Sequence, residues 1–300
     1  MDIFIQQMVN GLTIGSLYAL VALGYTMVYG VMRLINFAHG DLVAMSAFVG
    51  LTVYTQIFGE NITSLVAVIT VFVFTAAIVA VVGVLLERLA YRPLRTAPRL
   101  SAVVSALGAG LVIQNSVMLI WGPNMKIFPS NIFPSTLWSF GGVVITFTQV
   151  MILGLSSVLM VGLYFFINRT KIGTAIRAVA IDQDAAKLMG INVNRIIMVI
   201  FVIGSALGAV AGLFIGVYYR GVTFDMGWMY GLNAFVAAIM GGIGNIPGAM
   251  LGGLMLGMFN AMITGYISSQ WAETFTFVLL IVILVFRPTG ILGEKVAEKV

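Results

Sequence analysis

Long apolar stretches constrain this chain more than any other feature of its sequence. Residues 65–86 and 196–219 carry no charged side chain, and each matches the ~20 residues that an α-helix needs to cross a bilayer. Hydrocarbon offers the backbone no hydrogen-bond partner, so spanning segments must be helices or closed barrels, and these stretches lack the alternation of barrel strands. The sequence therefore predicts an all-α fold, a polytopic transmembrane helix bundle.

The composition excludes a water-soluble fold. Apolar residues make up 61% of the chain and charged residues 8%, whereas a soluble domain carries about 25% charged residues. The net charge of +5 does not indicate nucleic acid, because the basic residues lie between the apolar stretches. There is no cysteine, and we predict no cofactor, metal site or catalytic residue. The start at Met1 and Asp2 lacks the basic region of a signal peptide, so the first span should be retained.

Hydropathy predicts seven spans and one interrupted segment. The spans are expected at residues 8–31, 38–58, 63–86, 101–121, 149–167, 196–219 and 272–286. Residues 229–266 are apolar but are interrupted at 241–248 by four glycines and a proline, which should break the helix. The two arms either both cross, or dip in and return as a re-entrant pair buried against protein.

The fifteen Lys and Arg residues are divided unequally between the connectors. Only two, Lys126 and Arg220, fall on one face of the predicted bundle. The other thirteen fall on the opposite face: Arg33, Arg88, Arg92, Arg95, Arg99, Arg169, Lys171, Arg177, Lys187, Arg195, Arg287, Lys295 and Lys299. The positive-inside rule places this larger group in the cytoplasm, and the N-terminus and the loop 122–148 outside.

The outer loop contains a predicted hairpin. β-prone residues at 136–140 and 143–148 flank the pair Gly141-Gly142, which suits a two-residue turn. An ordinary connector and a docking surface explain this hairpin equally well. No long linker or charged low-complexity segment follows it, so residues 1–300 form one transmembrane domain.

The connector 168–195 contains a short helix of soluble type. Asp182 is a suitable N-cap, Asp184 lies in the first turn, Lys187 lies in the last turn, and Gly190 suits the left-handed residue that ends a helix. Such a helix would fit a cleft on a cytoplasmic motor. The alternative is a surface helix with no partner, which is the better expectation for an arbitrary membrane protein.

The same segment carries a resemblance to a known family. Asp184, Ala185, Ala186, Lys187, Leu188, Met189 and Gly190 resemble the EAA loop of ABC importer permeases, with Asp184 in place of glutamate. Residues 10–29, 35–40, 87–99, 241–253 and 288–293 extend the likeness over essentially the whole chain. Together they resemble the Liv-type permeases of branched-chain amino acid ABC importers, and most closely their smaller permease subunit.

The resemblance implies a multi-pass permease subunit in the bacterial inner membrane, in which residues 168–195 form the cytoplasmic coupling loop. Its implied partners are a second permease subunit, two cytoplasmic ATPase subunits, an external substrate-binding protein and membrane lipid. The chain has no phosphate-binding P-loop, so we expect ATP hydrolysis on separate subunits and no enzymatic activity here. Branched-chain amino acids are the expected cargo, and urea or short-chain amides are the alternative.

Seven residues are candidates for the translocation path: Asn36, His39, Gln114, Asn115, Asn233, Gly244 and Asn245. His39 is the only histidine; it could relay protons, but a role in positioning the helix start is favoured. Gln114 and Asn115 are expected inside a span, where bonds between helices explain such amides more often than a wet pathway.

Asn233 and Asn245 flank the interrupted segment. Its helix ends could present backbone groups to a zwitterionic solute. Tight packing at Gly248, Gly252 and Gly253 is an equally good explanation.

Two rival functions are poorly supported. A secondary transporter needs acidic groups within its spans, but Asp41 is expected near a span end and the other acidic residues in connectors or at edges. An intramembrane enzyme would need a Gly-x-Ser-x-Gly or His-Glu-x-x-His pattern, and neither is present. A passive channel is left open and would be identified by flux that does not depend on ATP.

Overall fold

The computed structural model describes residues 2–59, 65–95, 97–129, 132–134 and 136–293. In this part of the chain the structure is mostly helical, and eight helices are long and apolar enough to cross a membrane. They are α1 (Asp2–Met32), α2 (His39–Phe58), α3 (Leu65–Leu86), α4 (Arg99–Trp121), α5 (Phe147–Arg169), α8 (Val193–Tyr219), α10 (Ile246–Tyr266) and α11 (Ala272–Phe286). α11 reaches spanning length together with the turn before it, as Ser269–Phe286. All seven predicted spans are confirmed as helices, with bounds that differ by a few residues.

The interrupted segment is confirmed as two helices. α9 (Met226–Gly241) and α10 are separated by residues 242–245, where Gly242 and Gly244 have φ of +107° and +96°. α10 is long enough to cross a membrane, whereas α9 is shorter. The break is therefore in the structure, but the structure shows no re-entrant helix pair.

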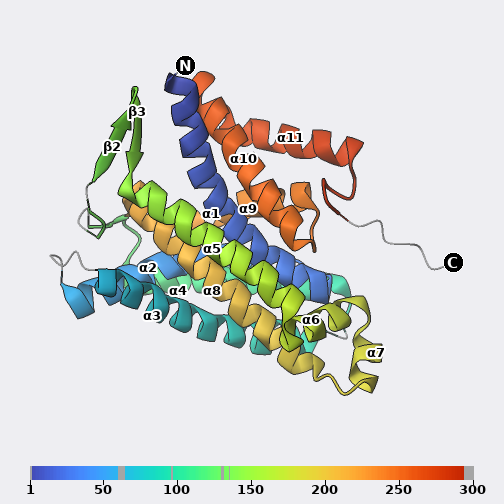
Figure 1. The fold of residues 1–300 in the computed structure, drawn as a ribbon. Helices are drawn as coiled ribbons and strands as arrows, with labels where there is room; N and C mark the ends of the chain where they lie inside the picture. The colour runs from blue at the N-terminus through green and yellow to red at the C-terminus, as the bar shows by residue number, and fades with distance from the viewer. Residues whose placement is uncertain (1, 60–64, 96, 130–131, 135, 294–300) are drawn as a thin grey trace.

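Shorter elements lie at the two ends of the bundle. α3 is followed by a π-helical turn (Glu87–Tyr91) and a 3₁₀ turn (Arg92–Leu94), and a 3₁₀ turn (Ser269–Trp271) precedes α11. Two helices that follow α5, α6 (Lys171–Ile181) and α7 (Gln183–Leu188), lie at the opposite end of the bundle from the hairpin of β2 (Leu137–Phe140) and β3 (Val143–Thr146) (Figure 1). We call these two ends the α7 end and the hairpin end.

The predicted hairpin at the hairpin end is confirmed. β2 and β3 pair antiparallel with Phe140 opposite Val143, so Gly141 and Gly142 form the two-residue turn, both at positive φ. The Gln6 side chain of α1 continues the ladder, since its Nε2 donates to Val144 O (3.1 Å) and its Oε1 accepts from Val144 N (2.8 Å). A second pair, β1 (Lys126–Ile127) with β4 (Gly221–Val222), was not predicted because each strand has only two residues.

Helix α1 is the centre of the bundle (Figure 1), and it packs antiparallel to α10 along most of its length. Gly11, Gly15 and Ala19 of α1 meet Ala261, Gly257 and Gly253 of α10, where an added Cβ on the glycines would collide with the backbone of the facing helix. Small residues at every fourth position let the two backbones touch, which is how helices associate in lipid.

The connectors rich in basic residues lie at the α7 end. These are the segments after α1, between α3 and α4, between α5 and α8, and after α11. Lys126, which belongs to β1, and Arg220, which precedes β4, lie at the other end. The grouping of the basic residues is therefore confirmed for those described, whereas Lys295 and Lys299 lie outside the described residues.

We predict that Gly257→Leu lowers the stability of the folded chain, because a side chain there must push α1 away from α10; overpacking of this kind costs about 1–3 kcal/mol. The measurement is the melting temperature of the detergent-purified chain, followed by size-exclusion chromatography. Gly154→Leu is the matched control, because a Cβ at Gly154 of α5 meets nothing within 4 Å. Equal melting temperatures for the two variants would show that the α1–α10 contact does not limit stability.

Candidate functional site

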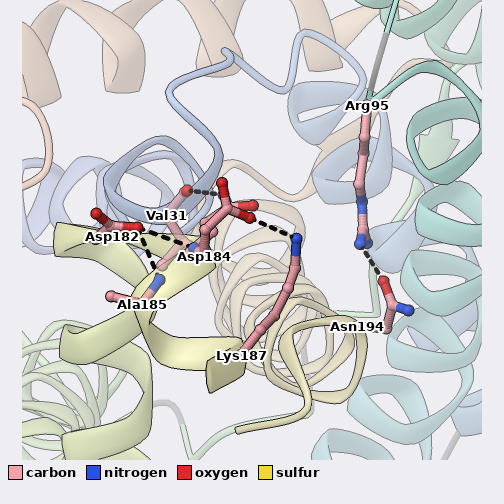
Figure 2. Close-up of polar contacts among 8 residues, drawn as sticks. Val31, Arg95, Asp182, Asp184, Ala185, Lys187 and Asn194 are labelled. Carbon is pink, nitrogen blue, oxygen red and sulfur yellow. Dashed lines mark hydrogen bonds and ion pairs between the residues drawn. The ribbon is translucent and has the colours of Figure 1, made fainter. Parts of the chain in front are cut away.

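Helix α7 is a short helix whose two ends are both closed by local hydrogen bonds. The Asp182 carboxylate accepts from Asp184 N (2.9 Å) and Ala185 N (3.0 Å) (Figure 2). Gly190 has φ +81° and donates to Lys187 O (3.0 Å), while Ile191 N donates to Ala186 O (3.0 Å), which is a Schellman end. The predicted cap and left-handed terminator are confirmed. Lys187 Nζ lies 2.9 Å from Asp184 Oδ1, with both side chains exposed, so this pair adds little stability.

One side of α7 is attached to the bundle, and the other side is exposed. Gln183 Nε2 donates to Val31 O at the end of α1 (3.0 Å), and Ala186 is buried. Leu188 and Met189 point away from the chain, with 89% and 82% of their surfaces exposed. The C-terminal end of α7 thus exposes two large apolar side chains.

Helix α6 precedes α7 and was not predicted. Thr170 caps it by accepting from Gly173 N (3.0 Å), and Gly173, Ile176 and Val179 are buried at helical spacing. Arg177 of α6 reaches back and donates to Ile167 O at the end of α5. The connector 168–195 therefore consists mainly of two short helices, α6 and α7, and α6 packs against the bundle.

A buried ion pair lies beside the start of α8. Arg95 contacts the Glu87 carboxylate, which is 2% exposed, and its Nη1 donates to Asn194 Oδ1 (2.6 Å) (Figure 2). Burial lowers the pKa of Arg95 and the Glu87 charge opposes this shift, yet an arginine remains charged. Arg95 thus joins the end of α3 to the connector that carries α7.

A cavity of about 550 Å³ opens at the α7 end, within the range of ~300–1,000 Å³ that is usual for small-molecule sites. It lies between the last turns of α1, helix α6, the α9–α10 break and residues 288–293. Pro288, Thr289 and Gly293 form one wall, and this segment is attached to α9 because the N–H groups of residues 291 and 292 donate to Met240 O and Gly241 O (both 2.9 Å). The broken helix pair therefore faces a cavity.

Of the seven path candidates, Gly244 and Asn245 line this cavity. Asn245 is the N-cap of α10: its Oδ1 accepts from Gly248 N (2.9 Å) and its Nδ2 donates to Leu292 O (2.9 Å). The cavity also contains residues that were not singled out as path candidates, namely Thr26, Tyr29, Arg33 and Arg177. Thr26, Tyr29 and Arg33 lie at the end of α1, whereas Arg177 lies on α6, so only the fold brings the four residues to one cavity.

The other candidates lie elsewhere in the bundle. Asn36 is buried and accepts from the Tyr91 hydroxyl (2.9 Å). His39 is buried at the start of α2, edge-on to the Tyr25 ring at 5.0 Å, and it occupies the space beside Gly24 and Gly208. His39 Nε2 has no hydrogen-bond partner among the described residues.

The three remaining amides each donate to their own helix backbone or lie on the surface of the chain. Asn115 is exposed on α4 and donates to Leu111 O (2.7 Å), and Gln114 beside it is partly exposed. Asn233 is buried in α9 and donates to Met229 O (3.0 Å). These three residues do not line the cavity.

The expected position of Asp41 near a span end is confirmed. Asp41 lies in the first turn of α2, but its carboxylate lies against Gly110, the central residue of α4. Residues 33–38 lead back into the bundle before α2 begins, so an acidic group lies at mid-bundle level. No group of three His, Cys, Asp or Glu side chains that could hold a metal ion occurs in the described part of the chain.

The multi-pass bundle, with a broken helix pair facing a cavity, defines an integral-membrane transport permease. Residues 7–285 match the family model described as branched-chain amino acid transport system / permease component. The chain belongs to this family. It is therefore related to transport components rather than to catalytic subunits.

Curated relatives cover the whole chain. It is 42% identical to the high-affinity branched-chain amino acid transport system permease protein BraD of Pseudomonas aeruginosa, over 99% of this chain and 98% of BraD. It is also 42% identical to the permease protein LivH of Escherichia coli, with the same coverage. The ribose import permease protein RbsC of Escherichia coli is 26% identical over 85% of this chain and 77% of RbsC.

We predict that Gly244→Leu reduces transport without loss of protein, because a leucine at φ +96° is strained by on the order of 1–2 kcal/mol and projects at the cavity. The measurement is solute uptake per inserted permease. Gly122→Leu is the control, because Gly122 has a similar φ of +87° and no neighbour within 4 Å. Normal uptake by Gly244→Leu would leave the break with a packing role only.

Proposed function

We propose that this chain is the membrane-spanning permease subunit of an ABC importer that carries branched-chain amino acids across the bacterial inner membrane. BraD and LivH are named as permease proteins of high-affinity branched-chain amino acid transport systems, and their likeness to this chain extends over 99% of its length. The observation that carries the proposal is the capped helix α7, which holds Leu188 and Met189 exposed at the end of the bundle where the basic connectors gather.

The exposed residues of α7 favour a protein partner. Burying a leucine or methionine side chain gives about 1.5–3 kcal/mol, so two such side chains on a fixed helix offer a compact contact. Helix α7 is rigid, because Asp182 and Gly190 close its two ends and the hydrogen bond from Gln183 to Val31 attaches it to α1. A cytoplasmic ATPase subunit is the partner that this element suits, with Asp184, Ala185, Ala186 and Lys187 at the contact.

The proposed assembly contains this permease, a second permease subunit, two ATPase subunits and an external substrate-binding protein. The membrane orientation follows from the basic connectors: the α7 end is cytoplasmic, and the hairpin end faces outward. ATP hydrolysis is assigned to the separate ATPase subunits.

We also propose that α9 crosses only part of the membrane. Gly227 and Gly231 near its start pack against Gly40, at the level where Asp41 meets the centre of α4. Residues 221–241 would thus dip from the outer face and reach the break, and α10 would return as a full span. Irregular backbone at this depth is tolerated because α1 and α2 cover it.

We predict that a cysteine at Thr174 is shielded from an impermeant thiol reagent added to intact cells, whereas a cysteine at Ser139 reacts. Both positions are exposed on the chain, and the chain has no cysteine of its own. The measurement is labelling before and after the membrane is permeabilised. The reverse pattern would invert the proposed topology.

We predict that Asp184→Arg and Gly190→Val weaken ATPase association while the permease stays inserted. Asp184→Arg places a cation at the positive end of α7, a change of about 0.3–1 kcal/mol. Gly190→Val forces a β-branched residue into φ +81°, at roughly 1–2 kcal/mol. The measurements are copurified ATPase per permease and solute-stimulated ATP hydrolysis.

Gly59→Val is the matched control for Gly190→Val. Gly59 also has positive φ (+69°) and no neighbour within 4 Å, but it lies away from α7 at the end of α2. If both α7 variants retain wild-type association and hydrolysis, α7 is a solvated connector and the coupling role is refuted.

A further inference from the structure

The corner between α3 and α4 contains a buried charge pair. Among the described Asp, Glu, Lys and Arg residues only Glu87 is buried, and it is paired with Arg95. The other ion pair in the described part of the chain, between Asp184 and Lys187, is exposed. Apolar residues in place of a buried ion pair often leave stability unchanged or raise it, so stability alone does not explain this pair. A guanidinium does, however, fix the relative position of the groups that it joins.

Arg95 joins this corner to the start of α8. One of its guanidinium nitrogens donates to Glu87, in the turn that follows α3, and the other donates to Asn194 Oδ1 at 2.6 Å (Figure 2). Asn194 is the second residue of α8, and only residues 189–192 separate α7 from this helix. The C-terminal end of α7 is thus attached, through the first turn of α8, to the end of α3.

The same corner is attached to the connector between α1 and α2. Glu87 and Tyr91 are four residues apart in the π-helical turn, and both are buried. The Tyr91 hydroxyl donates to Asn36 Oδ1 (2.9 Å), and the Tyr91 ring packs against Phe201 of α8, with ring centroids 5.2 Å apart. Single π-helical turns are rare and are frequent at functional sites. The corner therefore links the start of α8 to Asn36.

Both ends of α7 are thereby attached to one short stretch, residues 31–36. The N-terminal end reaches Val31 O directly through Gln183 (3.0 Å). The C-terminal end reaches Asn36 through the first turn of α8 and the α3–α4 corner. A helix that is attached at one point can pivot when it is pushed, whereas a helix attached at two points moves the segment that it is attached to. Val31 and Arg33 line the cavity, so with both attachments a push on α7 acts on the cavity wall.

We propose that Glu87, Arg95 and Asn194 form the second attachment, which couples α7 to the cavity wall. Arg95 is a positioning residue, because it acts through Asn194 by keeping the start of α8 fixed to the α3–α4 corner. Without this attachment α7 pivots about its bond to Val31, and ATP is hydrolysed with little transport. The inference rests on the proposed function, which it deepens by assigning to these three residues the coupling of hydrolysis to transport.

The test is the number of leucine molecules taken up per ATP hydrolysed by the full complex in proteoliposomes. Asn194→Ala removes the acceptor from Arg95 and leaves the pair of Arg95 with Glu87 intact. Asn194 is exposed, so the melting temperature of the permease and the amount of copurified ATPase should be unchanged. The uptake per ATP should fall roughly fivefold, the factor that corresponds to one typical hydrogen bond.

Matched variants make the test specific. Asn194→Asp keeps an oxygen acceptor for Arg95, so the uptake per ATP should stay at the wild-type value. Tyr91→Phe keeps the ring and removes only the hydroxyl that bonds to Asn36, so the uptake per ATP should fall as it does in Asn194→Ala. Tyr164→Phe is the control for this change, because Tyr164 is a tyrosine exposed on α5.

Three outcomes would overturn the inference: a wild-type uptake per ATP in Asn194→Ala, an equal fall in Asn194→Ala and Asn194→Asp, or loss of copurified ATPase from Asn194→Ala, which would assign this residue to docking. A lower melting temperature with unchanged uptake per ATP also refutes it, because the ion pair would then be structural only.

The wild-type complex separates the two proposals. ATP-driven uptake of leucine, isoleucine or valine by this complex supports the proposed function, whatever the variants show. Absence of uptake of all three refutes the proposed function and, with it, the coupling role of Arg95.

Discussion

Backbone contact between α1 and α10 is the interaction on which the rest of the structure depends. Lipid is as apolar as leucine, so helices in a membrane are held by packing and hydrogen bonds rather than by expulsion of water. Gly15 and Gly257 let the two antiparallel backbones touch, and this contact continues to Gly30, which lies beside Gly244. The position of the α9–α10 break is therefore set by a contact that runs along the whole of α1.

Because α1 is fixed in this way, it connects the parts of the molecule that the proposed function uses. Its last turns provide Thr26 and Arg33 to the cavity, and Val31 O accepts the bond from Gln183 of α7. A displacement of α7 would thus act on the same helix end that walls the cavity. Arg95, between Glu87 and Asn194, holds the other side of the connector, so such a displacement would be resisted at the start of α8.

The sequence predicted the elements whose signals are local. The spans follow from hydropathy, the β2–β3 hairpin from Gly141-Gly142, and the ends of α7 from Asp182 and Gly190. It missed α6, because an amphipathic pattern of eleven residues is hard to recognise in a chain that is apolar throughout. It placed Asp41 near a span end but did not reveal that its carboxylate lies against Gly110 of α4, because the return of residues 33–38 into the bundle leaves no mark in hydropathy. The cavity depends on tertiary contacts between Thr26, Arg177 and Asn245, so only the fold could reveal it.

The electrostatic potential at the α9–α10 break depends on the partial charges of the two helix ends that meet there. The C-terminal end of α1 meets the N-terminal end of α10 near Gly30 and Gly244, and two opposite partial charges so close together would largely cancel. Arg33 changes this balance. It ends α1 in left-handed geometry, at φ +54°, with its N–H bonded to Tyr29 O (2.8 Å). A non-glycine residue in this conformation is strained. Its guanidinium offsets the negative end of α1, so the positive end of α10 and Arg177 determine the charge that the cavity presents.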